Sequence, residues 1–265
     1  MRMLILGSRG MLGQEAVKYF KKQDGLTVIK DSLRFDYDDV EGYIEYIKEL
    51  KPDVILNCIG LIKQKSCDFS QLVKLNSLFP FLVARSVNAQ FIHASTDCVF
   101  SGAPNKCKEV DSVPDCYDDY GISKYFGELG LLNLSNAKII RASIIGITQN
   151  YSSKGLMDWF ASTSSDLKVN GFVNHYWNGI TTLTWCEICH KLIIGEIELD
   201  LIQAGTKKVY SKYEMLKLFS ERLTDRAEIN QHEDADIVDR SLSPNYLVDS
   251  LESQLNKYFN ELESK

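Results

Sequence analysis

The chain has 265 residues, of which 45% are hydrophobic, and a formal net charge of −6 at pH 7. This length fits one large α/β domain, or such a domain with a small accessory lobe, and it is ample for a continuous core. The acidic balance argues against nucleic acid or an anionic membrane as a partner. With no long apolar span, no signal peptide and seven scattered cysteines, we expect a cytoplasmic protein with reduced thiols.

An apolar run at residues 1–6 leads directly into the closely spaced Gly7, Gly10 and Gly13, and then into a helical pattern. A dinucleotide site needs this order. The first glycine permits a tight turn, the second lets the backbone approach a pyrophosphate, and the third lets the helix pack closely on the strand. The free N–H groups of the helix then face the phosphates. The spacing is GxxGxxG rather than the commoner GxGxxG, and three glycines can also form an ordinary loop.

Strands alternate with helices along the next part of the chain. We predict further strands at 26–29, 33–37, 53–58, 90–95 and 137–142, and helices at 11–22, 40–50, 69–87 and 120–133. Because parallel strands need crossover connections, this order predicts an α/β protein with a doubly wound parallel sheet of the Rossmann type.

The alternation loosens beyond residue 146, where 151–172 and 207–265 show helices with polar breaks. We expect residues 1–146 and 178–206 to form the dinucleotide-binding domain. Residues 147–177 and 207–265 would form a small C-terminal substrate-binding lobe over the carboxyl ends of the strands. The CxxCH pattern at 186–190 could suggest haem attachment. It lies in a helical pattern with no export signal, so we interpret it as structural.

Two groups of polar residues follow predicted strands and carry the chemistry. Tyr120 and Lys124 lie four apart on one helix face, where the ammonium would lower the pKa of the phenol and make it a usable acid or base. Ser95 and Thr96 end a strand near the expected cofactor, where a hydroxyl can hydrogen-bond a substrate carbonyl. Taken singly, the YxxxK pattern is also compatible with a surface tyrosine over a lysine stem.

Taken in order, these pieces resemble an extended short-chain dehydrogenase/reductase, and more narrowly the dTDP-4-dehydrorhamnose reductase family. The resemblance rests on STDCVFSG at 95–102 and YGISKYFGE at 120–128, with LNCIG, KLNSLFP, IIRASIIG and GITTLT at family-like places. It implies that Tyr120 is the proton donor, that Lys124 assists it and binds the nicotinamide ribose, and that Thr96 polarises the keto oxygen. It further implies the cofactor contacts Gly7, Arg9, Gly10, Met11, Leu12, Gly13, Asp36, Cys58, Ile59, Gly60 and Asn76, in addition to Tyr120 and Lys124.

The sequence departs from the family pattern at Cys98, where a tyrosine is usual, and at Ile180, where proline is frequent. These changes bear on which sugar is bound more than on hydride chemistry. Glu15 matches a position where some relatives hold magnesium at a dimer contact. A single helical glutamate is usually only solvated, so we predict no metal site.

The acidic residue that would bind the ribose 2′-OH is Asp31, and it stands among three cations, Arg9, Lys30 and Arg34. Cations around this point favour a 2′-phosphate, so we expect NADPH rather than NADH. For the lid over the sugar we expect residues 174–182, with Ser95, Asn178 and Thr181 as substrate contacts. The other interpretation is that this loop packs on the lobe's own core and that Thr182 caps the next helix.

The resemblance implies a reductase of a nucleotide-activated 4-keto-6-deoxy sugar, in the synthesis of precursors for cell-surface polysaccharides. A nucleotide-sugar epimerase with tightly held NAD stays open as an alternative. So does a non-catalytic NADP-binding regulatory subunit, since a relative of the family serves methionine adenosyltransferase in that way. The expected partner is the sugar-nucleotide substrate, and a homodimer stays open.

Overall fold

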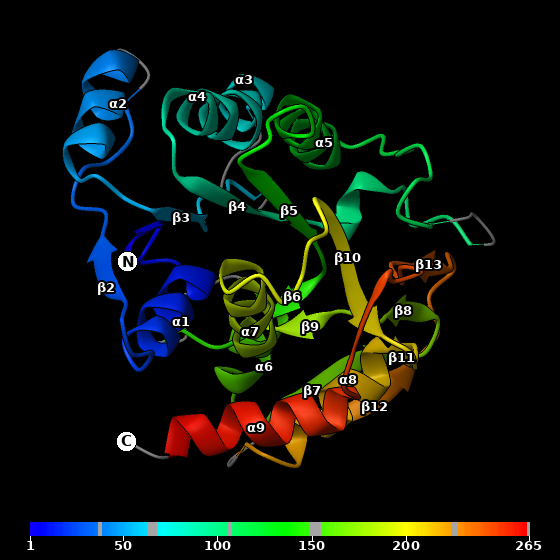
Figure 1. Ribbon diagram of the computed structural model, residues 1–265. Coiled ribbons are helices and arrows are strands. Elements are labelled where there is room, and N and C mark those ends of the chain that lie inside the picture. Colours follow the sequence, from blue (N-terminus) through cyan, green and yellow to red (C-terminus); the bar gives the residue numbers. More distant parts are fainter. Residues whose placement is uncertain (37–38, 63–67, 105–107, 149–154, 224–226, 264–265) are drawn as a thin grey trace.

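Seven parallel strands form the central sheet in the order β14–β10–β5–β4–β3–β1–β2 (Figure 1). The computed structural model describes residues 1–36, 39–62, 68–104, 108–148, 155–223 and 227–263. The strand order reverses at β1, which is where doubly wound sheets bind ligands. The sheet strands are β1 (Arg2–Leu6), β2 (Thr27–Lys30), β3 (Val54–Asn57), β4 (Gln90–Ser95), β5 (Ala137–Arg141), β10 (Leu201–Thr206) and β14 (Tyr246–Val248).

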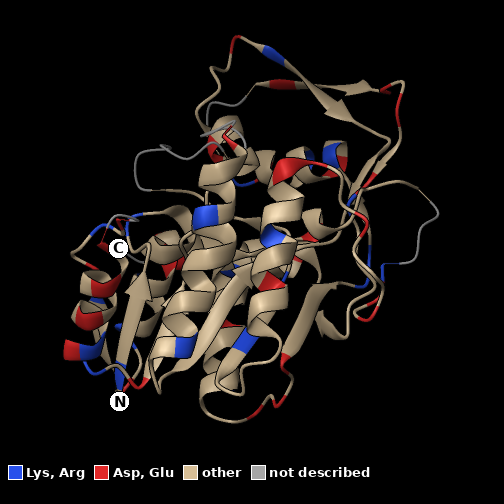
Figure 2. Cartoon of the chain, turned by 90° about the horizontal axis from the view of Figure 1, so that it is seen from above, with Lys and Arg blue, Asp and Glu red and all other residues tan. Residues whose placement is uncertain are grey.

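Helices cover both faces of this sheet (Figure 1). One face packs against α1 (Met11–Phe20) and α7 (Thr182–Ile193), and the opposite face packs against α2, α4 and α5. Both layers bury apolar side chains on the strands. Figure 2 shows that acidic and basic residues are spread over helices, strands and loops. The second layer comprises α2 (Val40–Glu49), α3 (Phe69–Val73), a π-helical turn (Lys74–Leu78), α4 (Phe79–Ser86) and α5 (Asp119–Leu131).

A smaller lobe with its own hydrophobic core lies beyond the carboxyl ends of the strands. Its core joins Phe160, Trp177, Tyr210 and Phe219 to residues of the last helix. A short parallel pair, β6 with β9, links the lobe to the sheet. The elements of this part are β6 (Ile144–Ile145), α6 (Leu156–Ala161), β7 (Lys168–Phe172), β8 (His175–Trp177), β9 (Ile180–Thr181), β11 (Tyr210–Ser211), α8 (Lys212–Ser220), β12 (Glu228–His232), β13 (Val238–Asp239) and α9 (Leu251–Glu263).

The parallel α/β fold predicted from the alternating pattern is confirmed. The short strand predicted at 33–37 is wrong for residues 33–36, which are irregular, and residue 37 lies outside the described residues. Phe35 there packs against Tyr43 and Phe79, so its apolar side chain serves the core without a strand. Instead of one long helix at 69–87, α3 and α4 are joined by the π-helical turn.

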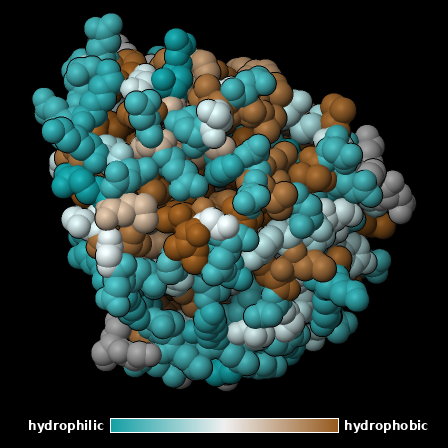
Figure 3. Space-filling view, in the orientation of Figure 1, coloured by the Kyte–Doolittle hydropathy of each residue, from teal (hydrophilic) through white to brown (hydrophobic). Residues whose placement is uncertain are grey.

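The lobe contains more strand than its sequence indicated, because β7 and β12 pair with each other and β8 pairs with β11 and β13. Residues 246–248, which we had placed in the lobe, form the sheet's edge strand β14. The two cysteines of the CxxCH pattern, Cys186 and Cys189, are buried free thiols on α7 in the core. On the face of the molecule seen in Figure 1, a central area of hydrophobic side chains is exposed and is surrounded by hydrophilic ones (Figure 3).

Within the described part of the chain, no helix combines the length and the apolar character that crossing a membrane requires.

Candidate active site

A cavity of about 660 Å³ lies between the carboxyl ends of the strands and the lobe. The glycine loop and its helix line one end with Gly10, Met11 and Leu12, and the end of β3 adds Cys58, Ile59 and Gly60. The catalytic candidates Thr96, Tyr120 and Lys124 line the same cavity, as does Ser95. The tertiary fold therefore brings together most of the residues that the sequence singled out.

The glycine loop has the geometry that its spacing predicted. Gly7 has φ +74°, a left-handed conformation that a side chain would strain. A Cβ on Gly13 would lie 2.1 Å from the Gly7 carbonyl oxygen, so the close approach of helix and loop requires a glycine there. Asp31, at the end of β2, braces the loop by accepting hydrogen bonds from the Gly7 amide (3.0 Å) and from the amide (3.2 Å) and hydroxyl (2.6 Å) of Ser8.

Tyr120 is buried beside the turn that follows β4. Burial raises the pKa of its phenol well above the ordinary value, while a hydrogen bond with Thr96 acts in the opposite direction. The lowering that we expected from Lys124 is not found, and the Lys124 Nζ is directed at groups of β4 instead. Tyr120 is therefore protonated at neutral pH, which is the form that can donate a proton.

Lys124 points its Nζ at two groups of β4, the Ala94 carbonyl oxygen at 2.7 Å and the His93 Nε2 at 3.1 Å. Burial lowers the pKa of Lys124 to about 8, against a smaller effect of Glu128. A lysine with such a pKa exchanges protons readily near neutral pH.

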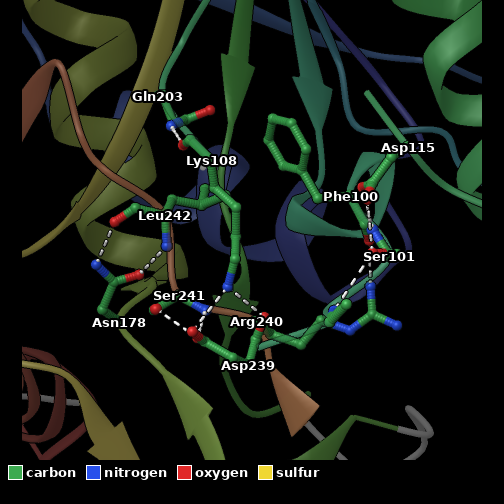
Figure 4. Close-up of polar contacts among 11 residues, drawn as sticks. Phe100, Ser101, Lys108, Asp115, Asn178, Gln203, Asp239, Arg240, Ser241 and Leu242 are labelled. Atoms are coloured by element: carbon green, nitrogen blue, oxygen red, sulfur yellow. Dashed lines mark hydrogen bonds and ion pairs between the residues drawn. The ribbon is translucent and has the colours of Figure 1, made fainter. Parts of the chain in front are cut away.

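The turn after β4 is held by its own side chains. Thr96 caps the 3₁₀ turn Asp97–Val99 by accepting from the Cys98 amide at 3.2 Å, and its hydroxyl donates to the Asp97 carboxylate at 3.1 Å. Burial raises the pKa of Asp97, partly offset by the charge of Arg240. Arg240 lies on the segment after β13, donates to the Phe100 carbonyl at 2.6 Å and lines the same cavity (Figure 4).

Ser95 has a structural partner that the sequence did not reveal. Its hydroxyl donates to Glu128 at 2.5 Å, and Glu128 forms a buried ion pair with Arg141 at 2.7 Å. Arg141 also donates to the side chain of Gln203 at 3.0 Å. The last residue of the YGISKYFGE motif thus ties the ends of β4, β5 and β10 together. Its signal in the sequence was its place four residues after Lys124, on the same face of the helix.

Asn76 lines neither of the two cavities described here, contrary to its expected role as a cofactor contact. Its side chain accepts from the Leu61 amide (2.8 Å) and donates to the Leu61 carbonyl (2.9 Å) and the Ser123 hydroxyl (2.9 Å). The π-helical turn carries Asn76 to this place, and the amide then holds the cavity-lining loop at Ile59 and Gly60 against α5.

A second cavity of about 630 Å³ adjoins the first, and the two share Gly10 and Ile59. It extends from the glycine loop along the end of β2. Its cations are Arg9, Arg34 and Lys74, all on exposed residues, and its carboxylates are those of Asp31 and Asp36. Three cations against two carboxylates leave the lining of this cavity with an excess of positive charge.

The stretch 174–182, expected as the lid, reaches the first cavity, but Asn178 and Thr181 do not line it. His175, Tyr176 and Trp177 on β8 line it. Asn178 instead donates to the carbonyls of Thr206 (3.0 Å) and Leu242 (2.8 Å) and accepts from the Leu242 amide (2.8 Å), as Figure 4 shows in part.

Thr181 is buried as well, and it caps α7 by accepting from the Thr184 amide at 3.2 Å. The assignment of Asn178 and Thr181 as substrate contacts is thus corrected, because both side chains are used by the scaffold. Glu15 is buried on α1, 3.8 Å from the Lys18 ammonium. Among the described residues, no group of three or more His, Cys, Asp or Glu side chains is placed to hold a metal ion.

The family model described as RmlD substrate binding domain matches residues 1–170, which is more than half of the chain. The chain belongs to the RmlD substrate-binding domain family. The match includes the glycine loop, the turn after β4 and α5, and so it covers every catalytic candidate.

Two curated relatives of the chain are informative. A dTDP-4-dehydrorhamnose reductase of Aggregatibacter actinomycetemcomitans is 32% identical over 147 residues, 52% of this chain and 49% of that protein. The methionine adenosyltransferase 2 subunit beta of Xenopus tropicalis is 30% identical over 157 residues, 54% of this chain and 47% of that protein. The chain thus spans about half the length of these curated relatives.

The fold extends beyond the matched region. The crystal structure of a Bacillus anthracis dTDP-4-dehydrorhamnose reductase in complex with NADP superposes with a TM-score of 0.82 at 18% identity, covering 98% of this chain and 99% of the other. The whole architecture, lobe included, is therefore that of the solved reductase.

Proposed function

We propose that the chain is an NAD(P)H-dependent reductase of a nucleotide-activated 4-keto-6-deoxy sugar, with NADPH preferred, in the synthesis of polysaccharide precursors. The observation that carries this proposal is the convergence of Thr96, Tyr120 and Lys124 on a cavity that adjoins the glycine loop. A dTDP-4-dehydrorhamnose reductase among the chain's relatives supports the substrate class.

The residues of the cavity fit a nicotinamide cofactor, because the glycine loop leaves backbone room and the floor is apolar at Ile144 and Ile145. When bound, the cofactor would supply hydride to the carbonyl carbon. Tyr120, kept protonated by burial, gives its proton to the carbonyl oxygen as charge develops there. The Thr96 hydroxyl, which donates to Asp97 in the structure, would turn its hydrogen toward that oxygen, and Lys124 as an ammonium would return a proton to the Tyr120 phenolate.

The second cavity supports the preference for NADPH. Arg9, Arg34 and Lys74 line it, and a 2′-phosphate on the adenosine ribose would meet their positive charge. Asp31, which would otherwise bind a 2′-hydroxyl, is occupied by the Gly7 and Ser8 groups.

On the lobe side of the first cavity, Lys212 and Arg240 are the cations of the lining. They suit the diphosphate of a sugar nucleotide, which is dianionic and needs a positive partner. The aromatic residues of β8 stand in the same wall and suit a flat base or a sugar ring.

The test is a panel of nucleotide 4-keto sugars supplied with NADPH or NADH, followed by absorbance and product NMR. We expect Tyr120→Phe to lower turnover at least ~100-fold with nearly unchanged NADPH affinity. Tyr125→Phe, on the same helix but in a separate apolar cluster, is the matched control. Equal turnover in Tyr120→Phe refutes the assignment, and tightly bound NAD without net consumption indicates an epimerase.

A second candidate is a non-catalytic NADP-binding subunit, favoured by the similarity to a methionine adenosyltransferase 2 subunit beta. It predicts NADPH binding without oxidation on any sugar of the panel, and a stoichiometric protein partner. Turnover that depends on Tyr120 excludes it as the sole function.

A further inference from the structure

Behind Lys124, three buried polar side chains lie in a row across the sheet. Asn57 at the end of β3 is 0% exposed, His93 on β4 is 0% exposed and Lys124 on α5 is 4% exposed. The Asn57 Nδ2 lies 2.9 Å from the His93 Nδ1, and the His93 Nε2 lies 3.1 Å from the Lys124 Nζ. Asn57 and His93 have no role in the reductase mechanism proposed for this chain, yet both are buried next to Lys124.

The direction of this row is set at its far end by a backbone group. The Ile59 amide donates to the Asn57 Oδ1 at 3.1 Å, and a backbone N–H cannot reverse its role. This identifies which end of the Asn57 amide is oxygen, so its NH₂ group faces His93 and donates to Nδ1. A neutral histidine that accepts at Nδ1 carries its proton on Nε2.

His93 is neutral because burial, the largest cause, lowers its pKa well below the ordinary value. Its Nε2–H is therefore directed at the Lys124 Nζ. An ammonium has no lone pair to accept that hydrogen bond, whereas an amine has one. The amine also keeps a hydrogen for the Ala94 carbonyl oxygen at 2.7 Å.

We propose that Asn57 and His93 are positioning residues that direct a hydrogen bond onto Lys124 and thereby favour its amine over its ammonium. The consequence for turnover rests on the proposed function: after Tyr120 has given its proton to the substrate oxygen, a lysine poised between amine and ammonium can take a proton from water and pass it to the Tyr120 phenolate.

The other titratable groups around Lys124 act differently. Glu128, one turn further along α5, favours the ammonium, but its carboxylate is held by Arg141 and Ser95. Tyr120 on the same helix is uncharged at neutral pH. Desolvation lowers the pKa of Lys124 to about 8 even though the charge of Glu128 raises it. The hydrogen bond from His93 would lower this pKa further.

The first measurement is the tautomer of His93 in the cofactor-free protein at pH 9, from long-range ¹H–¹⁵N spectra of histidine-labelled protein. The chain has four histidines, so the signal that is lost in His93→Gln assigns the resonance. We expect the proton on Nε2. A proton on Nδ1 overturns the proposal, and this decision needs no variant that might fail to fold.

The second measurement is the titration midpoint of Lys124 by NMR of lysine-labelled protein, assigned through Lys124→Met. Asn57→Leu frees His93 to place its proton on Nδ1 and to accept from the ammonium, so the midpoint should rise by at least about one pH unit, a tenfold change in the dissociation constant. Simple desolvation by leucine would lower it instead. An unchanged or lowered midpoint in Asn57→Leu overturns the proposal.

Tyr19→Phe is the matched control, because Tyr19 contacts another histidine, with its hydroxyl 3.2 Å from the His190 Nδ1. It should leave the Lys124 midpoint unchanged. Both measurements use protein without cofactor or substrate. If the Lys124 midpoint rises in Asn57→Leu but the protein reduces no sugar of the panel, only the proposed function is wrong. If the protein reduces a sugar in a Tyr120-dependent way but the midpoint does not move in Asn57→Leu, only this inference is wrong.

Discussion

Replacing Asn178 with alanine should cost stability rather than substrate affinity. The side chain is 3% exposed and makes three hydrogen bonds to backbone groups of β10 and of the segment that follows β13. Each such bond contributes about 1 kcal/mol net, and a buried partner left without one costs about 1–3 kcal/mol. With three partners, we expect Asn178→Ala to lower the free energy of unfolding by about 3–5 kcal/mol.

Urea unfolding followed by circular dichroism measures this loss by linear extrapolation. Asn178→Asp is a sharper variant, because a carboxylate keeps the acceptor for the Leu242 amide but turns an oxygen toward the two carbonyls, so it should destabilise at least as much at pH 7. The matched control is Asn230→Ala, an exposed position on β12, expected within about 0.5 kcal/mol of the parent. A loss below about 1 kcal/mol in Asn178→Ala, together with a raised KM for the sugar nucleotide, would refute this reasoning and restore Asn178 as a substrate contact.

Three further outcomes follow from the site. Glu128→Gln leaves Arg141 buried without its ionic partner and should lower the free energy of unfolding by about 3–5 kcal/mol, measured by the same unfolding assay; a change under 1 kcal/mol would show that the pair is not structural. The pKa of Lys124 is lowered to about 8, so between pH 8 and about 10.5 Lys124 binds a proton in the unfolded chain but not in the folded protein. The free energy of unfolding should therefore rise across this pH window by up to about 3 kcal/mol relative to that of Lys124→Met. If the two proteins change in stability with pH in the same way, the prediction is wrong. Arg34→Ala should raise the Kd for NADPH about tenfold by fluorescence titration while changing that for NADH less than twofold, and equal losses for both would remove the 2′-phosphate from this cavity.

Local pattern sufficed for much of the fold. The strand at 90–95 was predicted with its observed bounds, and the helix over 40–50 ends within one residue of α2. The glycine spacing after β1 predicted the tight turn and the close helix packing that Gly7 and Gly13 display. These features depend on side-chain periodicity and on backbone conformation, which neighbouring residues specify.

The pairing of strands that lie far apart in the chain could not be predicted from the local sequence. The lobe's strands β7 and β12 lie far apart in the chain and are short, so neither carries a strong alternation of its own. The edge strand β14 joins the sheet only because β10 stands beside it. Such strands depend on a partner that the local sequence does not name.

For the candidate site too, the sequence predicted some features and only the tertiary structure decided others. Residue type and order along the chain singled out Tyr120 and Lys124, and the family resemblance added Thr96; the structure places all three along one cavity. Which way each side chain faces was decided by tertiary contacts. Asn178 and Thr181 have the composition of sugar contacts, yet buried carbonyls and a helix end claim their hydrogen bonds. Buried backbone N–H and C=O groups need hydrogen-bond partners, and nearby polar side chains supply them. Only the folded structure shows which buried groups lie near which side chain.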